Sequence, residues 1–108
     1  MKNYYLLGMK GIRDCNNRKI RLEYYMSESE KNSVSDEPVY GIKIVKYHKE
    51  ERKKEKEESF GISKDKSEVE KLIIKFLDND VMPSTLLCLV DEYITLREEN
   101  RMAALMCS

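Results

Sequence analysis

The chain has 108 residues, of which 41% are apolar and 37% are charged, and its formal net charge is zero. This length suits one domain with a single modest core and leaves no room for a second. The apolar fraction is too high for a disordered protein, and the charged fraction predicts long solvated faces or loops.

The charges are unevenly distributed along the chain. Residues 1–22 carry six Lys and Arg against one acid, and residues 43–56 carry seven against three. Residues 23–37 carry five acids against one base, and from residue 57 onward acids outnumber bases by eleven to six. The pattern predicts two basic patches in the N-terminal half and an acidic C-terminal half.

Cysteine usage and the N-terminal residues indicate the compartment. The three cysteines (Cys15, Cys88 and Cys107) form no C-x-x-C pair and leave one thiol over in any disulfide scheme, as is typical of a reduced cytosolic protein. Residues 4–7 are too short an apolar run for a signal peptide, and no stretch approaches the roughly 20 apolar residues of a membrane span. We expect a cytoplasmic protein.

Alternating apolar residues predict the first strands. Residues 3–7 suit a short strand, and the glycines and asparagines of residues 8–18 predict a connection. Residues 20–26 alternate cleanly between apolar and polar, which indicates a half-buried strand. Residues 27–37 contain a single apolar residue and are predicted to be a mobile loop.

Residues 39–47 form the clearest predicted strand, with Tyr40, Ile42 and Ile44 on one side. The charged stretch that follows is either a hairpin tip or the charged ends of two strands. Residues 58–62 resume the alternation and predict a last strand. This strand must be antiparallel to its predecessor, because the connection is too short for a parallel crossover.

Helical periodicity begins after residue 63. Asp65 and Glu68 form a predicted capping box, with Ser63 as a competing cap, and Pro83 marks the start of a second helix. The first helix has an apolar stripe formed by Val69, Leu72, Ile73, Phe76 and Leu77. The second has a stripe formed by Leu86, Leu89, Val90, Tyr93 and Ile94.

These elements predict an α+β fold in a single domain, residues 1–108. An antiparallel three- to four-stranded meander within residues 1–62 is followed by a C-terminal helical hairpin within residues 63–101, packed on one sheet face. Residues 102–108 are predicted to be a flexible tail. The predicted core consists of Ile20, Leu22, Tyr24, Tyr40, Ile42, Ile44, Phe60, Ile62, Val69, Leu72, Ile73, Phe76, Leu86, Leu89, Val90 and Tyr93.

The sheet face opposite the helices has no predicted cover. It carries Tyr25, Val45 and Tyr47, and no further segment of the chain is left to pack on it. An uncovered apolar patch on a small protein predicts a protein partner, often a second copy of the chain. We therefore take these three residues as the candidate protein interface.

Five short motifs resemble a family of small uncharacterised proteins from anaerobic, spore-forming Gram-positive bacteria. The resemblance covers nearly the whole chain and rests on the order of the motifs, since each alone is weakly specific. It implies a single bacterial cytosolic domain and supplies no activity, cofactor or catalytic residue. The motifs are Tyr4-Tyr5-Leu6-Leu7, Leu22-Glu23-Tyr24-Tyr25, Tyr40-Gly41-Ile42-x-Ile44-x-Lys46, Gly61-Ile62-Ser63-x-Asp65-Lys66 and Val81-x-Pro83-x-x-Leu86.

Catalytic and cofactor chemistry finds little support in the sequence. His48 is the only histidine and stands near no set of metal ligands, so we interpret it as a residue of a charged strand end. Cys88 is interpreted as a buried structural thiol. The four glycines form no phosphate-binding loop, and Gly41 and Gly61 are predicted to mark a bulge or a close helix contact. We expect no enzyme, cofactor, metal or small-molecule substrate.

A nucleic-acid-associated regulator is the alternative hypothesis. Basic residues beside the aromatic strand could neutralise phosphates while the tyrosines stack bases. Interleaved glutamates and the zero net charge argue against this reading, because nucleic-acid binders usually have a clear positive excess. The candidate contacts are Lys43, Lys46, Lys49, Arg52, Lys53 and Lys54.

Overall fold

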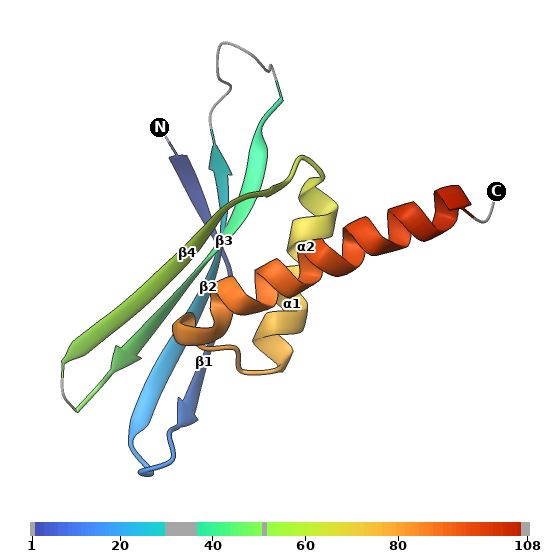
Figure 1. Ribbon diagram of the computed structural model, residues 1–108. Coiled ribbons are helices and arrows are strands. Elements are labelled where there is room, and N and C mark those ends of the chain that lie inside the picture. The colour runs from blue at the N-terminus through green and yellow to red at the C-terminus, as the bar shows by residue number, and fades with distance from the viewer. Residues whose placement is uncertain (1, 30–36, 51, 107–108) are drawn as a thin grey trace.

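The structure, a computed structural model, describes residues 2–29, 37–50 and 52–106. Four antiparallel strands form one open sheet in the order β1-β2-β3-β4, followed by two helices. Both helices lie on the same side of the sheet (Figure 1), so the molecule has two layers. The predicted α+β fold is thus confirmed, with four strands in the meander. The elements are β1 (Lys2–Arg13), β2 (Lys19–Ser29), β3 (Val39–His48), β4 (Lys53–Ser63), α1 (Lys66–Asp78) and α2 (Pro83–Met106).

The pairing of β2 with β3 fixes the two faces of the sheet. Tyr24 is opposite Ile44 and Met26 is opposite Ile42, and all four side chains are buried beneath the helices. Because side chains alternate along a strand, the residues between them point to the other face. Apolar alternation on β2 and β3 therefore decides which face the helices cover.

The helices are anchored by their ends as well as by their apolar stripes. The Asp65 carboxylate caps α1 by accepting hydrogen bonds from the amides of Ser67 and Glu68, as predicted. The predicted box is not closed by Glu68, because the Asp65 amide donates to Ser63 Oγ at 3.0 Å. At the other end of α1, the Lys10 ammonium of β1 donates to the Leu77 carbonyl oxygen at 2.6 Å. On the sheet, α1 contacts β1, β2 and β3, whereas α2 lies mainly against β4.

The buried core agrees with most of the predicted positions. Tyr40, Leu89 and Tyr93 are half-buried at its margin, and Met26 and Val81 join it. Phe60 is the exception, because its side chain is 60% exposed. Residues fully or nearly buried in this cluster are Leu22, Tyr24, Met26, Ile42, Ile44, Ile62, Val69, Leu72, Ile73, Phe76, Val81, Leu86 and Val90.

A bulge between β3 and β4 explains the error at Phe60. The register shifts between Tyr40 and Ile42, and Gly61 adopts a φ of +58°, which other residues rarely accept. A Cβ at Gly41 would lie 2.4 Å from the carbonyl oxygen of Ser59. The two glycines therefore mark a bulge and not a helix contact, and the bulge breaks the alternation that placed Phe60 inside.

Several element boundaries also differ from the prediction. β2 continues through residues 27–29, which were predicted to belong to a mobile loop, and β4 begins at Lys53. Residues 30–36 of that predicted loop lie outside the described part of the chain. β1 extends to Arg13, so residues 8–13 belong to a strand and not to a connection. Gly8 is compatible with that strand because a Cβ there would lie 2.6 Å from a Leu77 methyl group, so the glycine lets α1 pack closely. The helix α2 continues through residues 102–106, which were predicted to be a tail, and residues 107–108 lie outside the described part of the chain.

The C-terminal part of α2 extends past the sheet (Figure 1). Within the residues that the structure describes, neither helix has the length and apolar character needed to cross a membrane. Cys88 is exposed on α2, which corrects its interpretation as a buried thiol, and Cys15 is exposed in the turn after β1. The third cysteine lies outside the described residues.

Candidate functional site: the open face of the sheet and strand β1

The open face is the side of the sheet opposite the helices, and the three predicted interface residues lie on it. Glu23 is opposite Val45, and Arg21 is opposite Tyr47, at positions that alternate with the buried core residues. Tyr25 occupies the same face of β2 two residues further on. The β-sheet thus brings Tyr25, Val45 and Tyr47 together as predicted from their alternation.

Val45 does not contribute accessible surface, since its side chain is only 3% exposed. Glu23 beside it is 8% exposed, and Tyr25 and Tyr47 are half-buried. Because the helices lie on the opposite face, these residues are covered by other side chains of the open face itself. Val45 therefore packs beneath the side chains that form the surface of the open face. A partner would contact those side chains and not Val45.

A layer of aromatic and charged side chains from β2, β3 and β4 covers the open face on the side of the two turns. The Arg21 guanidinium carbon lies 4.5 Å from the centre of the Tyr47 ring, and the Lys54 ammonium lies 5.5 Å from it. The Tyr25 hydroxyl donates a 2.6 Å hydrogen bond to Glu23, whose other oxygen lies 3.2 Å from Arg21 Nε. The Glu23 hydrogen bond and partial desolvation raise the pKa of Tyr25 to about 12.

Tyr4 of β1 reaches across the same face to β4. Its hydroxyl donates to the two carboxylate oxygens of Glu58, at 2.9 and 3.1 Å, and the Lys43 ammonium lies 4.7 Å from its ring centre. Desolvation and the Glu58 hydrogen bond raise the pKa of Tyr4. A shallow hollow of about 310 Å³ adjoins it, lined by Tyr4, Lys43, Lys56, Glu57, Glu58 and Phe60.

The strand β1 carries the most exposed apolar surface that the structure describes. Five of the ten exposed large apolar side chains lie on it, each between 37% and 56% exposed. They are Tyr4, Tyr5, Leu6, Leu7 and Met9. β1 is an edge strand, hydrogen-bonded only to β2 among the described strands, so its outer edge also presents unpaired backbone groups.

Sequence reasoning missed this strand as part of the site. The glycines at 8 and 11 suggested a connection, so the apolar residues before them appeared to form only a short element. The available signal was the run from Asn3 to Met9, which contains no charged residue in a chain that is 37% charged. Edge strands normally carry charges or prolines that prevent pairing, so this absence is informative.

A second polar cluster joins β4, α1 and α2. Glu68 accepts hydrogen bonds from the Tyr93 hydroxyl, from Ser63 Oγ at 2.8 Å and from Arg97 Nη1 at 3.1 Å. Arg97 also donates to the Ile62 carbonyl oxygen at 3.2 Å. These donors, Tyr93 foremost, lower the pKa of Glu68. The cluster fastens the helical layer to the sheet.

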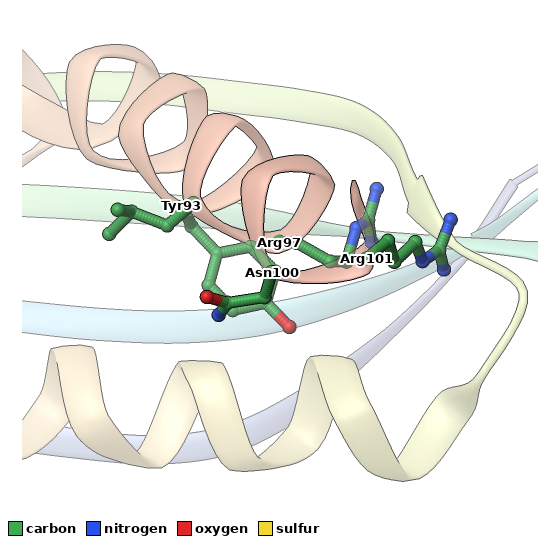
Figure 2. Close-up of a pocket in the computed structure, with 5 residues that line it drawn as sticks. Tyr93, Arg97, Asn100 and Arg101 are labelled. Atoms are coloured by element: carbon green, nitrogen blue, oxygen red, sulfur yellow. The ribbon is translucent and has the colours of Figure 1, made fainter. Parts of the chain in front are cut away.

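A hollow of about 420 Å³ lies beside this cluster along α2. Figure 2 shows the Tyr93 and Asn100 side chains extending from α2 toward α1. The residues that line this hollow come from consecutive turns of α2, and one of them, Arg97, forms an ion pair with Glu68. The lining residues are Tyr93, Leu96, Arg97, Asn100 and Arg101.

The six candidate nucleic-acid contacts do not share one face of the sheet. Lys43 and Lys54 lie on the open face, each over a tyrosine ring. Lys46 and Lys53 each lie 3.8 Å from a carboxylate oxygen of Glu55. The other two, Lys49 and Arg52, belong to the turn between β3 and β4.

Within the part of the chain that the structure describes, groups suited to metal binding are not brought together by the fold. His48 is half-buried with its Nε2 3.5 Å from a Glu55 oxygen. Among the described residues, no group of three or more His, Cys, Asp or Glu side chains could hold a metal ion. Its carboxylate neighbour among the described residues is Glu55.

The fold and its open face define a small α+β domain whose helices cover one side of an antiparallel meander. Residues 3–96 match the model of a family of unknown function, DUF6514. The match covers most of the chain, so the protein belongs to this family. It spans the sheet, α1 and the part of α2 up to Leu96. Searches of curated proteins and of solved structures found no match.

Proposed function

We propose that this protein is a non-enzymatic interaction module of the bacterial cytoplasm that associates with a second copy of itself through β1 and the adjoining open face. The observation that carries the proposal is the exposed, uncharged apolar run of β1 on an unpaired sheet edge. The restriction to anaerobic, spore-forming Gram-positive bacteria is part of this proposal and rests on the five sequence motifs.

The edge favours a second copy because an antiparallel pairing of two identical edge strands is isologous. A two-fold axis perpendicular to the sheet joins β1 to its equivalent and keeps both helical layers on the same side. Leu6, Leu7 and Met9 of each copy would then pack against apolar side chains of the other. The outer backbone groups of β1 would gain hydrogen-bond partners.

The open face contributes less to this association than the edge does. Its aromatic rings already hold cations, and its hydroxyls already donate to carboxylates within the same chain. A surface whose polar groups are satisfied gains little from a new partner, whereas an unpaired strand edge gains a set of hydrogen bonds. The proposal therefore places the main contact on β1.

Sedimentation velocity across a range of protein concentrations tests the proposal. The wild-type chain is expected to shift from monomer to dimer as concentration rises. Leu6→Lys places a charge at the centre of the proposed edge contact, and we expect it to remain a monomer. Leu87→Lys is the matched control: Leu87 is 50% exposed on α2, away from β1, and this variant should dimerise like the wild type.

Two results would refute the edge contact. One is a wild-type chain that stays monomeric at every concentration. The other is a Leu6→Lys variant that is folded by circular dichroism and dimerises as well as the wild type. Phe60→Lys tests whether the contact is confined to β1. Phe60 is exposed on β4, the other edge strand of the sheet, so this variant should dimerise like the wild type.

A further inference from the structure

The turn between β1 and β2 and the turn between β3 and β4 lie at the same end of the sheet (Figure 1). The hairpin end comprises residues 13–21 and 46–55, since Glu55 is opposite Lys46 in the sheet. The Lys49 amide donates to the Lys19 carbonyl oxygen at 3.4 Å, so the two segments are in direct contact. The fold thus joins two parts of the chain that are far apart in sequence.

The hairpin end is strongly basic although the whole chain is neutral. Its two segments carry nine Lys and Arg and four acids, while the rest of the chain carries eleven Lys and Arg and sixteen acids. The hairpin end therefore has a formal charge of +5, balanced by −5 elsewhere, by difference of these counts. The zero net charge conceals a separation of charge along the molecule.

Screening makes the local charge the relevant one for a ligand at this end. At physiological ionic strength, exposed charges further apart than about 8 Å are largely screened from each other. The acids of α2 begin two turns after its start, and α2 runs away from the hairpin end (Figure 1). A polyanion at the turns would interact chiefly with their cations.

A hollow of about 340 Å³ at this end has a cationic rim. Arg13 and Lys19 flank it from the first hairpin and Lys49 from the second, and no acid is among its lining residues. Gly11, Ile12 and Ile20 complete the lining, and Ile20 is buried. The hollow can place an anionic group between cations from two hairpins.

Several of these cations are available to a ligand. Lys19, Lys49 and Arg52 are exposed, and among the residues described no carboxylate forms an ion pair with any of them. Lys46 and Lys53, by contrast, share Glu55. The ligand-facing cations are therefore mainly those of the turns and not those within the strands.

We propose that the hairpin end binds the phosphate backbone of single-stranded nucleic acid without reading its sequence. A nucleic-acid strand presents closely spaced phosphates that can meet cations from both turns at once. The Tyr47 ring at the same end already lies against Arg21 and Lys54, so the contact is made through phosphates and not by stacking of bases. The close, regular spacing of the phosphates favours nucleic acid over an acidic protein surface.

Fluorescence anisotropy with a fluorescein-labelled single-stranded oligouridine tests this inference. We expect binding at low salt that weakens steeply as salt is added, because bound phosphates release counterions. In the combined variant Arg13→Gln, Lys19→Gln and Lys49→Gln, affinity at low salt should fall about tenfold. The slope of log affinity against log salt should become shallower by about 2, since each lost phosphate contact removes roughly 0.7.

The matched control changes the same charge elsewhere. Lys64→Gln, Lys66→Gln and Lys71→Gln together remove three exposed cations from the region of α1 and should leave affinity and slope close to wild type. No binding at low salt, or an equal loss in the control, would overturn the inference. Displacement of the RNA by polyglutamate at an equal concentration of charges would assign the surface to acidic proteins instead. None of the six substitutions lies within the Asn3 to Met9 run, so dimerisation should be unchanged.

Discussion

The two faces of the sheet are covered by different means. On one face, apolar side chains such as Ile44 are buried by two helices and contribute mainly by removal from water. On the other, Val45 is nearly as buried, but tyrosine rings, cations and carboxylates of the sheet itself surround it. Adjacent residues of one strand thus belong to two unlike environments.

This difference indicates how the sheet can remain half uncovered. The open face satisfies its own polar groups, as shown by the hydrogen bonds of Tyr4 to Glu58 and Tyr25 to Glu23. A face of this kind needs no further layer for its polar groups. What remains unsatisfied is the edge of β1, where apolar side chains and backbone groups are both exposed.

The largest expected effect compares the two sides of β3 directly. Ile44→Ala should lower the free energy of unfolding by about 2–5 kcal/mol, because it leaves a cavity in a packed core. Val45→Ala should cost about 1.5 kcal/mol, since it removes two methylene equivalents from a self-covered surface. Urea unfolding measures both. Equal losses would mean that the open face is a second core.

The bulge between β3 and β4 provides the next effect. An alanine Cβ at position 41 would lie 2.4 Å from the Ser59 carbonyl oxygen and 2.7 Å from Ser27 Oγ. We expect Gly41→Ala to cost about 1–3 kcal/mol in urea unfolding, because backbone must move. Gly11→Ala is the control, since the nearest atom there is 3.9 Å away, and its effect should be small. A loss of stability in Gly41→Ala as small as that in Gly11→Ala would show that the bulge can relax.

The polar cluster on the helical side predicts a dependence on pH. Hydrogen bonds from Tyr93, Ser63 and Arg97 lower the pKa of Glu68 below its ordinary value of 4.5. A lowered pKa in the folded state stabilises the protein above pH 4.5, and this stability is lost as pH falls through the folded pKa. Thermal melts should show Glu68→Gln less stable than wild type near neutral pH, with the gap closing in acid. A constant gap would exclude linkage to this carboxyl.

The smallest expected effect concerns Tyr25 on the open face. Its hydroxyl bonds Glu23, and its pKa is raised from 10.0 to about 12. A raised pKa in the folded state means that stability is present below pH 10.0 and lost as pH rises toward 12. Tyr25→Phe should cost about 1 kcal/mol at neutral pH and remove one late-ionising tyrosine from an ultraviolet titration. The exposed Tyr5→Phe serves as the comparison, with a smaller loss.

The strongly periodic elements could be predicted from the sequence because one physical pattern dominated each of them. The alternation around Tyr24 and Ile44 gave β2 and β3, and the stripe that includes Val69 with the Asp65 cap gave α1. Both local signals agree with the tertiary structure. The uncovered face was predicted from the same alternation, because the two helices cover one face and no further element was left to cover the other.

The remaining features depend on contacts that local patterns do not encode. β1 was predicted too short because glycines usually indicate turns, whereas Gly8 here admits a Leu77 methyl group from α1. Phe60 was misplaced because a bulge on β4 interrupts the alternation. The bond between Tyr4 and Glu58 joins the two edge strands, 54 residues apart, and requires the register of the whole sheet.

Hydrogen–deuterium exchange of β1 as a function of protein concentration tests the central claim most directly. If β1 pairs with a second copy, its outward-facing amides between residues 3 and 9 should exchange rapidly in dilute solution. They should become protected as concentration rises, while the exchange of β3 stays unchanged. Exchange of the β1 amides that is the same at all concentrations would contradict the account.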